Sequence, residues 1–298
     1  MKIALIGKFS LMHDEEYIAC SFEKLGHEVV RIEQAFQPRT AMQVIEDEMP
    51  DIVIWGKLNY REHTKFFIKM LKDMGIKTVC WLFDLYFDYH REFMVSSAPY
   101  FKADLVVTTD DGHENRWKDL KINHKCVRQG IYDDGCFLMP FQEPIHAVVF
   151  VGSDNPVFPE RKRIMWKLDK DFDFKWYGKR DTNEVRGTEL NELFSKSKVV
   201  VGDSFYSPYY WSNRIVETLG RGGFLIHQEV EGLKEEYPDL VTYKRGDYDD
   251  LKAKIQYYLE HEDERREIIR KNFELVKSRY TMDKKCQELL TCLNLSTN

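Results

Sequence analysis

Residues 213–227 read NRIVETLGRGGFLIH, a charged helix start that runs into a double glycine and then into a short apolar strand. Arg214 and Glu217 stand three residues apart, a spacing that puts both side chains on one face of a helix. The pair Gly222 and Gly223 is typical of a turn, and the FLIH run after it is typical of a buried strand. The stretch therefore predicts a helix that returns the chain to a sheet, which is the unit from which α/β folds are built.

The same alternation of apolar runs and helical stretches covers most of the chain. In the first half the strand-like runs are KIALIG, EVVRI, DIVIWG, KTVCWLF, DLVVTT and KCVRQ. In the second half they are HAVVFVG, FDFKWYG, KVVVGD and GFLIH, with helices predicted after Pro159, after Thr188 and from about Ser212. Strands that alternate with helices pair in parallel, so the pattern predicts an α/β fold of two Rossmann-like domains.

This rhythm pauses at residues 137–146, FLMPFQEPIH, which contain two prolines and no hydrophobic period. The pause predicts an N-terminal Rossmann-like domain over residues 1–140 and a C-terminal one over residues 141–280. Residues 281–298 are predicted to form a C-terminal helix that packs back on the N-terminal domain. Because Rossmann-like folds bind ligands at the carboxyl ends of their strands, we expect the site residues just after strands, on the walls of a cleft between the domains.

Composition excludes several classes of protein. The chain of 298 residues has a net charge of −6, and no apolar run approaches the roughly 18 residues of a membrane helix. Its start, MKIALIG, is too short for a signal peptide, so a cytoplasmic location is expected. The six cysteines form no C-x-x-C pair, which fits reduced thiols better than a zinc site or disulfides. The basic residues within 57–77 predict a solvated helix face in preference to an acceptor-binding patch.

Two common nucleotide-binding motifs are absent. The first strand is followed by GKFSLMHDE, with a single glycine in place of G-x-G-x-x-G, and no G-x-x-x-x-G-K-[ST] occurs. A dinucleotide-dependent oxidoreductase and a P-loop nucleotidase are therefore disfavoured. The same loop carries Lys8, Ser10 and His13, and His13 is either a general base or an ordinary surface histidine.

The loops after the strands of the second half are rich in groups that bind phosphate. Ser153 follows Gly152 at the end of HAVVFVG, and Lys179 and Arg180 follow FDFKWYG. Helix N-terminal amides together with Lys or Arg hold a diphosphate without a P-loop. A nucleoside diphosphate is therefore the ligand that this half favours.

The helix that begins near Ser212 places Asn213, Arg214 and Glu217 on one face at the expected cleft. A carboxylate there can accept hydrogen bonds from the two hydroxyls of a ribose. Alternatively, Arg214 and Glu217 form a surface ion pair worth a few tenths of a kcal/mol. Spacing alone does not separate the two interpretations.

A family resemblance favours the first interpretation. Residues 212–237, SNRIVETLGRGGFLIHQEVEGLKEEY, and the later helix with Asp263–Arg265 resemble the C-terminal domain of GT-B glycosyltransferases, most closely the glycosyl transferases group 1 with its CgeB-like members. VVFVGS at 148–153, the arginines at 161 and 163 and KWYG at 175–178 also resemble that family. The resemblance covers roughly residues 146–290, whereas the N-terminal half resembles the family only in general pattern.

The resemblance implies roles for individual residues. Glu217 would hold the ribose of a nucleotide sugar, and the turn of Gly222 and Gly223 would let backbone amides approach the donor. Tyr177 and Gly178 would lie beside the base. The candidates to neutralise the leaving diphosphate are Arg161, Lys179, Arg180 and Arg214.

No metal or other cofactor is expected. Asp171-Phe172-Asp173 forms a D-x-D, but it precedes a strand and is interpreted as a turn.

The chain departs from the family at one position. Many retaining relatives carry two glutamates eight positions apart, and Tyr209 stands where the first would be. Inversion at the sugar would need a base from the N-terminal domain, for which His13 and Asp84 are the candidates, whereas retention would use the leaving phosphate. Asp84 has an alternative interpretation as the cap of a following helix.

The sequence therefore predicts a metal-independent hexosyltransferase that takes a sugar from a nucleoside-diphosphate donor, a UDP-sugar in our interpretation. The acceptor is open among a glycan, a protein, a small molecule and modified DNA, and the oligomeric state is also open. One alternative is a phage-type DNA glycosyltransferase that acts on hydroxymethylated bases through the basic residues of 57–77 and the aromatic residues of 81–87. Another is a non-catalytic nucleotide-sugar-binding protein on the same scaffold.

Overall fold

The computed structural model describes residues 1–10, 13–155, 158–178 and 183–295. The chain divides into two compact units, which are described separately. Unit 1 comprises residues 1–129 together with 282–298, and unit 2 comprises residues 130–281. In the described parts of the chain, no helix combines the length and the apolarity needed to cross a membrane.

Unit 1 is built on a six-stranded parallel sheet with the order β2-β1-β3-β4-β5-β6. Its strands are β1 (Lys2–Gly7), β2 (Glu28–Glu33), β3 (Ile52–Trp55), β4 (Lys77–Trp81), β5 (Leu105–Thr108) and β6 (His124–Cys126). All five pairings are parallel, as the alternation of strands and helices predicts.

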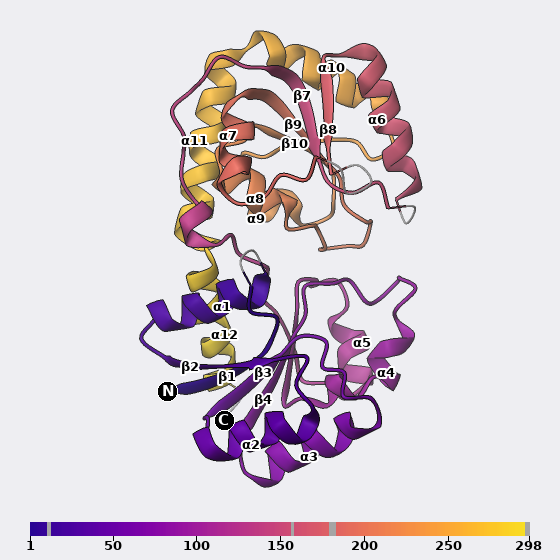
Figure 1. Cartoon of the computed structure of the whole chain (residues 1–298). Helices are drawn as coiled ribbons and strands as arrows, with labels where there is room; N and C mark the ends of the chain where they lie inside the picture. The colour runs from indigo at the N-terminus through magenta and orange to yellow at the C-terminus, as the bar shows by residue number, and fades with distance from the viewer. Residues whose placement is uncertain (11–12, 156–157, 179–182, 296–298) are drawn as a thin grey trace. The chain divides into compact units, whose positions relative to one another are not determined.

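Helices cover both faces of this sheet (Figure 1). Its helices are α1 (Asp14–Lys24), α2 (Pro38–Glu48), α3 (Thr64–Asp73), α4 (Phe93–Ser97), α5 (Glu114–Asp119) and α12 (Met282–Leu295), with short 3-10 turns η1 (Arg61–His63) and η2 (Pro99–Lys102). α2 and α3 pack on one face, and α1 and α12 pack side by side on the other. Cys286 of α12 donates its S–H to the carbonyl of Ile18 in α1 at 3.9 Å, so α12 belongs to the core of unit 1.

Unit 2 is built on a five-stranded parallel sheet with the order β11-β10-β9-β7-β8. Its strands are β7 (His146–Val151), β8 (Phe174–Tyr177), β9 (Ser197–Gly202), β10 (Leu225–Gln228) and β11 (Val241–Tyr243). Its helices are α6 (Pro159–Asp171), α7 (Thr188–Ser195), α8 (Arg214–Gly220), α9 (Leu233–Glu236), α10 (Tyr248–Glu260) and α11 (Glu262–Arg279), with the turn η3 (Asp133–Gly135). α6 and α10 pack on one face of the sheet, whereas α7, α8, α9 and α11 pack on the other.

Local signals account for most of these boundaries. Pro159 opens α6, and the side chain of Asp247 accepts a hydrogen bond from the amide of Asp250 at 3.0 Å, which caps α10. Asp171 ends α6 and Asp173 precedes β8, so the expected turn at the D-x-D is confirmed. The helix of the opening stretch begins at Arg214, two residues later than predicted.

Candidate functional site

The strand order locates a switch point in the sheet of unit 2. β7 has β8 on one side and β9 on the other, so the connections that leave β7 and β9 diverge at the carboxyl edge of the sheet. Open α/β sheets bind their ligands at such a point. Gly152 and Ser153 follow β7 there, Asp203 follows β9, and Arg214 opens the helix after it.

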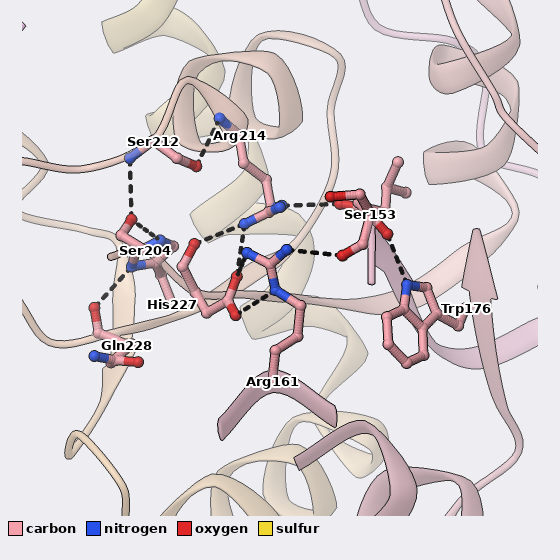
Figure 2. Close-up of polar contacts among 11 residues, drawn as sticks. Ser153, Arg161, Trp176, Ser204, Ser212, Arg214, His227 and Gln228 are labelled. Carbon is pink, nitrogen blue, oxygen red and sulfur yellow. Dashed lines mark hydrogen bonds and ion pairs between the residues drawn. The ribbon is translucent and has the colours of Figure 1, made fainter. Parts of the chain in front are cut away.

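A buried carboxylate joins these loops. Arg161 donates Nε to Asp203 Oδ2 at 2.8 Å and Nη2 to Oδ1 at 2.9 Å, which is a bidentate contact. Arg214 donates Nη1 to Oδ1 of the same carboxylate at 2.9 Å and to the Asp203 carbonyl at 2.6 Å. Figure 2 shows the guanidinium groups of Arg161 and Arg214 next to each other. The side chains of Asp203, Arg161 and Arg214 are 9%, 4% and 13% exposed, so water screens the cluster little.

The two arginines also hold the backbone of the loop after β7. Arg161 Nη1 donates to the carbonyl of Ser153 at 2.8 Å, and Arg214 Nε donates to the carbonyl of Val151 at 2.9 Å. Both guanidinium groups lie over the ring of Phe150, which closes the cluster from one side. The cluster therefore fixes the ends of β7 and β9 against the start of α8.

The charges in the cluster support one another. Burial raises the pKa of Asp203, but the charge of Arg214 and the hydrogen bond of Arg161 outweigh it, so the pKa lies below its usual value. Burial lowers the pKa of Arg214, and the charge of Asp203 opposes that shift. We therefore assign an ionised carboxylate shared by two cations.

A second polar chain runs beside the cluster (Figure 2). The amide of Ser212 donates to Ser204 Oγ at 3.0 Å, and Ser204 Oγ lies 3.1 Å from Nε2 of His227. The other ring nitrogen of His227 lies 2.7 Å from the carbonyl of Gln228. Burial lowers the pKa of His227 to about 4, so the ring is neutral, and we assign the proton to Nδ1 because Nδ1 faces a carbonyl.

Two glycines lie together where β7 and β8 end. Gly152 has a φ of 154°, and a Cβ there would stand 2.5 Å from Nη2 of Arg214. Gly178 has a φ of 82°, and its Cβ would stand 3.3 Å from the carbonyl carbon and oxygen of Gly152. The amide of Gly152 donates to the carbonyl of Tyr177 at 2.9 Å, and its carbonyl accepts from Trp176 Nε1 at 2.7 Å. The two glycines therefore let the ends of β7 and β8 pack closely against each other and against the side chains of Arg214 and Phe150, where a Cβ would be crowded.

The interpretation of Arg214 and Glu217 as an ion pair with each other is wrong. Arg214 pairs with Asp203, and Glu217 accepts from Arg221 Nε at 2.9 Å. The expectation that Arg161 and Arg214 face a diphosphate also needs correction, because both guanidinium groups are buried and already share a carboxylate. In the structure the two arginines instead position the loop after β7, on which such a ligand would lie.

Glu217 keeps part of its carboxylate accessible. Its side chain is 27% exposed, and the partner Arg221 is 5% exposed. Arg221 Nη1 also donates to Asn191 Oδ1 at 2.6 Å and to the carbonyl of Gly187 at 2.8 Å. Asn213 precedes α8 as its N-cap residue. A carboxylate held from one side by a buried arginine is oriented and can accept hydrogen bonds on the other side.

Gly222 and Gly223 do not offer amides to a ligand. Their amides donate to the carbonyls of Leu219 at 3.2 Å and Thr218 at 2.8 Å, within the turn that ends α8. This turn precedes β10 and so lies at the amino edge of the sheet. The expected role of this turn at the donor is therefore corrected, because its amides are already satisfied.

Tyr177 is also placed differently from the expectation. Its hydroxyl lies 3.0 Å from Nε2 of His146, the first residue of β7, so the ring runs along the sheet and away from the carboxyl edge. That direction does not place the ring beside a base at this edge. Lys179 and Arg180 lie outside the described residues.

The candidates in unit 1 lie at the carboxyl edge of its own sheet. His13 precedes α1 in an extended conformation and is exposed, with its amide donating to the carbonyl of Ser10 at 3.1 Å. Asp84 follows β4, where it contacts Lys57 Nζ and lies 2.8 Å from Arg91 Nη1. Its interpretation as a helix cap is wrong, because the next helix, α4, begins only at Phe93.

The charges around Asp84 make it a weak base. Burial raises its pKa, but the hydrogen bond and charge of Lys57 and the charge of Arg91 outweigh burial, so the pKa lies below its usual value. A general base works best with a pKa near the working pH, and these charges take the pKa of Asp84 further from it.

Sequence reasoning missed the residues that organise the site in unit 2: Asp203, Ser204, Trp176 and His227. The only signal for Asp203 is its position directly after the strand KVVVG. The expectation of reduced cysteines stays a prediction. Among the residues that the structure describes, no group of three or more His, Cys, Asp or Glu side chains is arranged to hold a metal ion.

Comparison with known proteins adds to this geometry. Residues 156–291 match the family described as Glycosyl transferase-like. The structure of Anabaena HepE in complex with UDP-glucose is similar over 99% of this chain and 100% of that chain, with a TM-score of 0.67 at 12% identity. The fold is GT-B. Its predicted class, two parallel Rossmann-like units, is thereby confirmed.

Two further GT-B structures are similar over nearly the whole chain. A UDP-forming α,α-trehalose-phosphate synthase from Burkholderia xenovorans has a TM-score of 0.61 at 9% identity, with 99% of each chain covered. An α1,3-fucosyltransferase has a TM-score of 0.58 at 13% identity, with 99% of this chain and 90% of that chain covered. Among curated proteins, none matches the sequence. The glycosyltransferase resemblance thus rests on unit 2 in sequence and on both units in fold, and its CgeB-like subdivision stays a prediction.

Proposed function

We propose that the chain is a glycosyltransferase that binds a nucleotide sugar at the carboxyl edge of the sheet in unit 2. The observation that carries the proposal is the oriented carboxylate of Glu217 on α8, the helix that Arg214 anchors to the switch point of a GT-B sheet. A ribose diol needs two acceptors, which one carboxylate supplies. Gly152 and Ser153 follow β7 at this switch point, where open α/β sheets bind their ligands, and this supports the same edge as the place of the rest of the donor.

We propose UDP as the nucleoside diphosphate and a hexose as the sugar. The similar Anabaena structure holds UDP-glucose, whereas a similar fucosyltransferase structure holds GDP-fucose. In the transfer, the bond between the anomeric carbon and the phosphate oxygen breaks, and the acceptor oxygen forms the new bond. The acceptor proton passes to a base, for which exposed His13 is our candidate if the sugar inverts. We also propose that no metal is needed.

We propose no DNA acceptor, because the basic residues of 57–77 are partly neutralised. Lys57 contacts Asp84, Lys69 Nζ lies 2.5 Å from Asp73, and Lys72 Nζ lies 3.0 Å from Asp104. An unopposed row of cations is what phosphate backbones require.

The test compares Glu217→Gln with Glu274→Gln, an exposed glutamate of α11 in the same unit. Binding of UDP-glucose and of a panel of UDP- and GDP-sugars is measured by calorimetry, and transfer is measured by release of the nucleotide. Loss of a charged acceptor costs about 1.5–3 kcal/mol, so Glu217→Gln should weaken donor binding about 10- to 100-fold and Glu274→Gln should not. Equal affinity in both variants would remove Glu217 from the site, and activity lost in EDTA would overturn metal independence.

A further inference from the structure

Unit 2 has a hollow at the edge of the sheet opposite the site described above. Its volume is about 430 Å³, and it is lined by residues 138–139 and 141–144, by Ser197 and Lys198 of β9, by Gly222 and by the first half of α11. Residues 138–144 precede β7 and Gly222 precedes β10, so these segments gather at the amino edge of the sheet. The hollow is therefore separate from the switch point between β7 and β9.

The lining of this hollow is basic in a chain whose net charge is −6. The basic side chains are Lys198, Arg221, Arg265, Arg266 and Arg270, and the acidic ones are Glu143 and Glu262. Arg221 forms an ion pair with Glu217, and Arg266 forms one with Glu262. Within the described parts of the chain, Lys198, Arg265 and Arg270 form no ion pair, so positive charge is left over.

Arg265 is the unusual member of this set. Its side chain is only 4% exposed, yet the hydrogen bond of its guanidinium among the described residues is the one from Nη1 to the carbonyl of Tyr258. Burial lowers the pKa of Arg265, and Glu262 opposes that shift only from a neighbouring turn. A buried guanidinium with unused donors facing a hollow is stabilised by an oxyanion, which accepts several of its N–H groups at once.

We propose that this hollow binds a phosphate group of an anionic ligand, with Arg265 as the buried anchor and Lys198 and Arg270 at its mouth. Exposed Leu138 and Phe141 lie in the same lining and give the ligand an apolar neighbour. A soluble organic phosphate and a lipid headgroup share this chemistry. Arg265, Lys198 and Arg270 are not among the residues proposed to hold the nucleotide sugar, so the proposal does not depend on the transfer reaction.

The experiment uses the full chain with pyrophosphate as the probe and follows Tm and calorimetric affinity. The double variant K198Q/R270Q removes two exposed or half-exposed charges and leaves the buried Arg265 in place, so folding is preserved. K175Q/K244Q removes the same charge from exposed positions of unit 2 outside the hollow. We expect saturable stabilisation of the wild type and of K175Q/K244Q, and affinity at least about tenfold weaker in K198Q/R270Q.

A second arm sediments the chain with vesicles of phosphatidylglycerol or of phosphatidylcholine. If the wild type binds the anionic vesicles and K198Q/R270Q does not, the phosphate belongs to a lipid headgroup. If the wild type binds pyrophosphate but no vesicles, the ligand is a soluble phosphate. Unchanged pyrophosphate affinity in K198Q/R270Q, with no variant-dependent vesicle binding, overturns the proposal. Binding of UDP-glucose is measured in parallel. It tests the proposed donor site, so a failure of that proposal can be told apart from a failure of the phosphate site.

Discussion

At the carboxyl edge of unit 2, Asp203 is 9% exposed and lies between two buried arginines, whereas at the same edge of unit 1 Asp84 is 40% exposed and lies between Lys57 and Arg91. Both carboxylates follow a strand of a parallel Rossmann-like sheet and both have two cationic partners. Water can replace a partner of Asp84 at little cost, but nothing in unit 2 can replace a partner of Asp203. The carboxylate with two cationic partners is therefore expected to stabilise the fold in unit 2, whereas in unit 1 its partners can be exchanged for water at little cost.

The largest effect is expected for Asp203→Ala. Removing this carboxylate leaves Arg161 and Arg214 buried without a counter-charge, which costs about 3–5 kcal/mol of the free energy of unfolding. Urea unfolding followed by tryptophan fluorescence measures the loss. A loss of less than about 1 kcal/mol in the free energy of unfolding would contradict the stabilising role given to Asp203.

Acid should weaken unit 2 through His227. The unfolded ring has a pKa near 6.5 and the folded ring about 4, so the unfolded state takes up the proton first and stability falls as the pH drops from about 6.5 to 4. The full loss is about 3 kcal/mol. His227→Gln should flatten this part of a stability profile measured from pH 7.5 to 4.5.

His124 is the matched control for this profile. It lies in unit 1, and burial lowers its pKa to about 3. His124→Gln should leave the contribution of His227 unchanged, and a pH profile that neither variant alters would refute both assignments.

A smaller effect is expected for Gly178→Ala, with Gly26→Ala as its control in unit 1. Their φ angles are 82° and 84°, so both substitutions cost about 1–2 kcal/mol of backbone strain. Only the Cβ at Gly178 meets backbone, whereas nothing lies within 4 Å of the one at Gly26. Thermal unfolding should show a greater loss for Gly178→Ala, and donor affinity should fall in that variant alone; equal losses would show that the glycine pair is not tightly packed.

The smallest effect is expected for Asp84→Asn. Because the side chain is 40% exposed, removal of its charge should change the free energy of unfolding by less than about 1 kcal/mol. The same urea titration used for Asp203→Ala measures it. A loss of several kcal/mol would mean that the two edges do not differ as their exposure indicates.

Much of the fold could be predicted because strand and helix patterns are local. KIALIG and KVVVGD form the strands β1 and β9 where their apolar runs lie, and Pro159 begins a helix as predicted. For the candidate site, the sequence pointed to Gly152, Gly178 and Glu217 because they stand at strand ends or on the helix of the opening stretch, and their role at a donor stays a prediction. The pairing of Arg161 and Arg214 with Asp203 could not be predicted, because Asp203 lies 42 and 11 residues away and its position after a strand does not say which side chains it meets.

The sequence by itself determined the two parallel Rossmann-like units and the helix that carries Arg214 and Glu217, because hydrophobic period and turn residues act over a few positions. Only the tertiary structure decided which charges pair. In the structure Arg214 pairs with Asp203 and Glu217 pairs with Arg221. The amides of Gly222 and Gly223 donate to carbonyls at the end of α8. Pairing of this kind depends on which side chains burial brings together and deprives of water, and spacing along the chain does not contain that information.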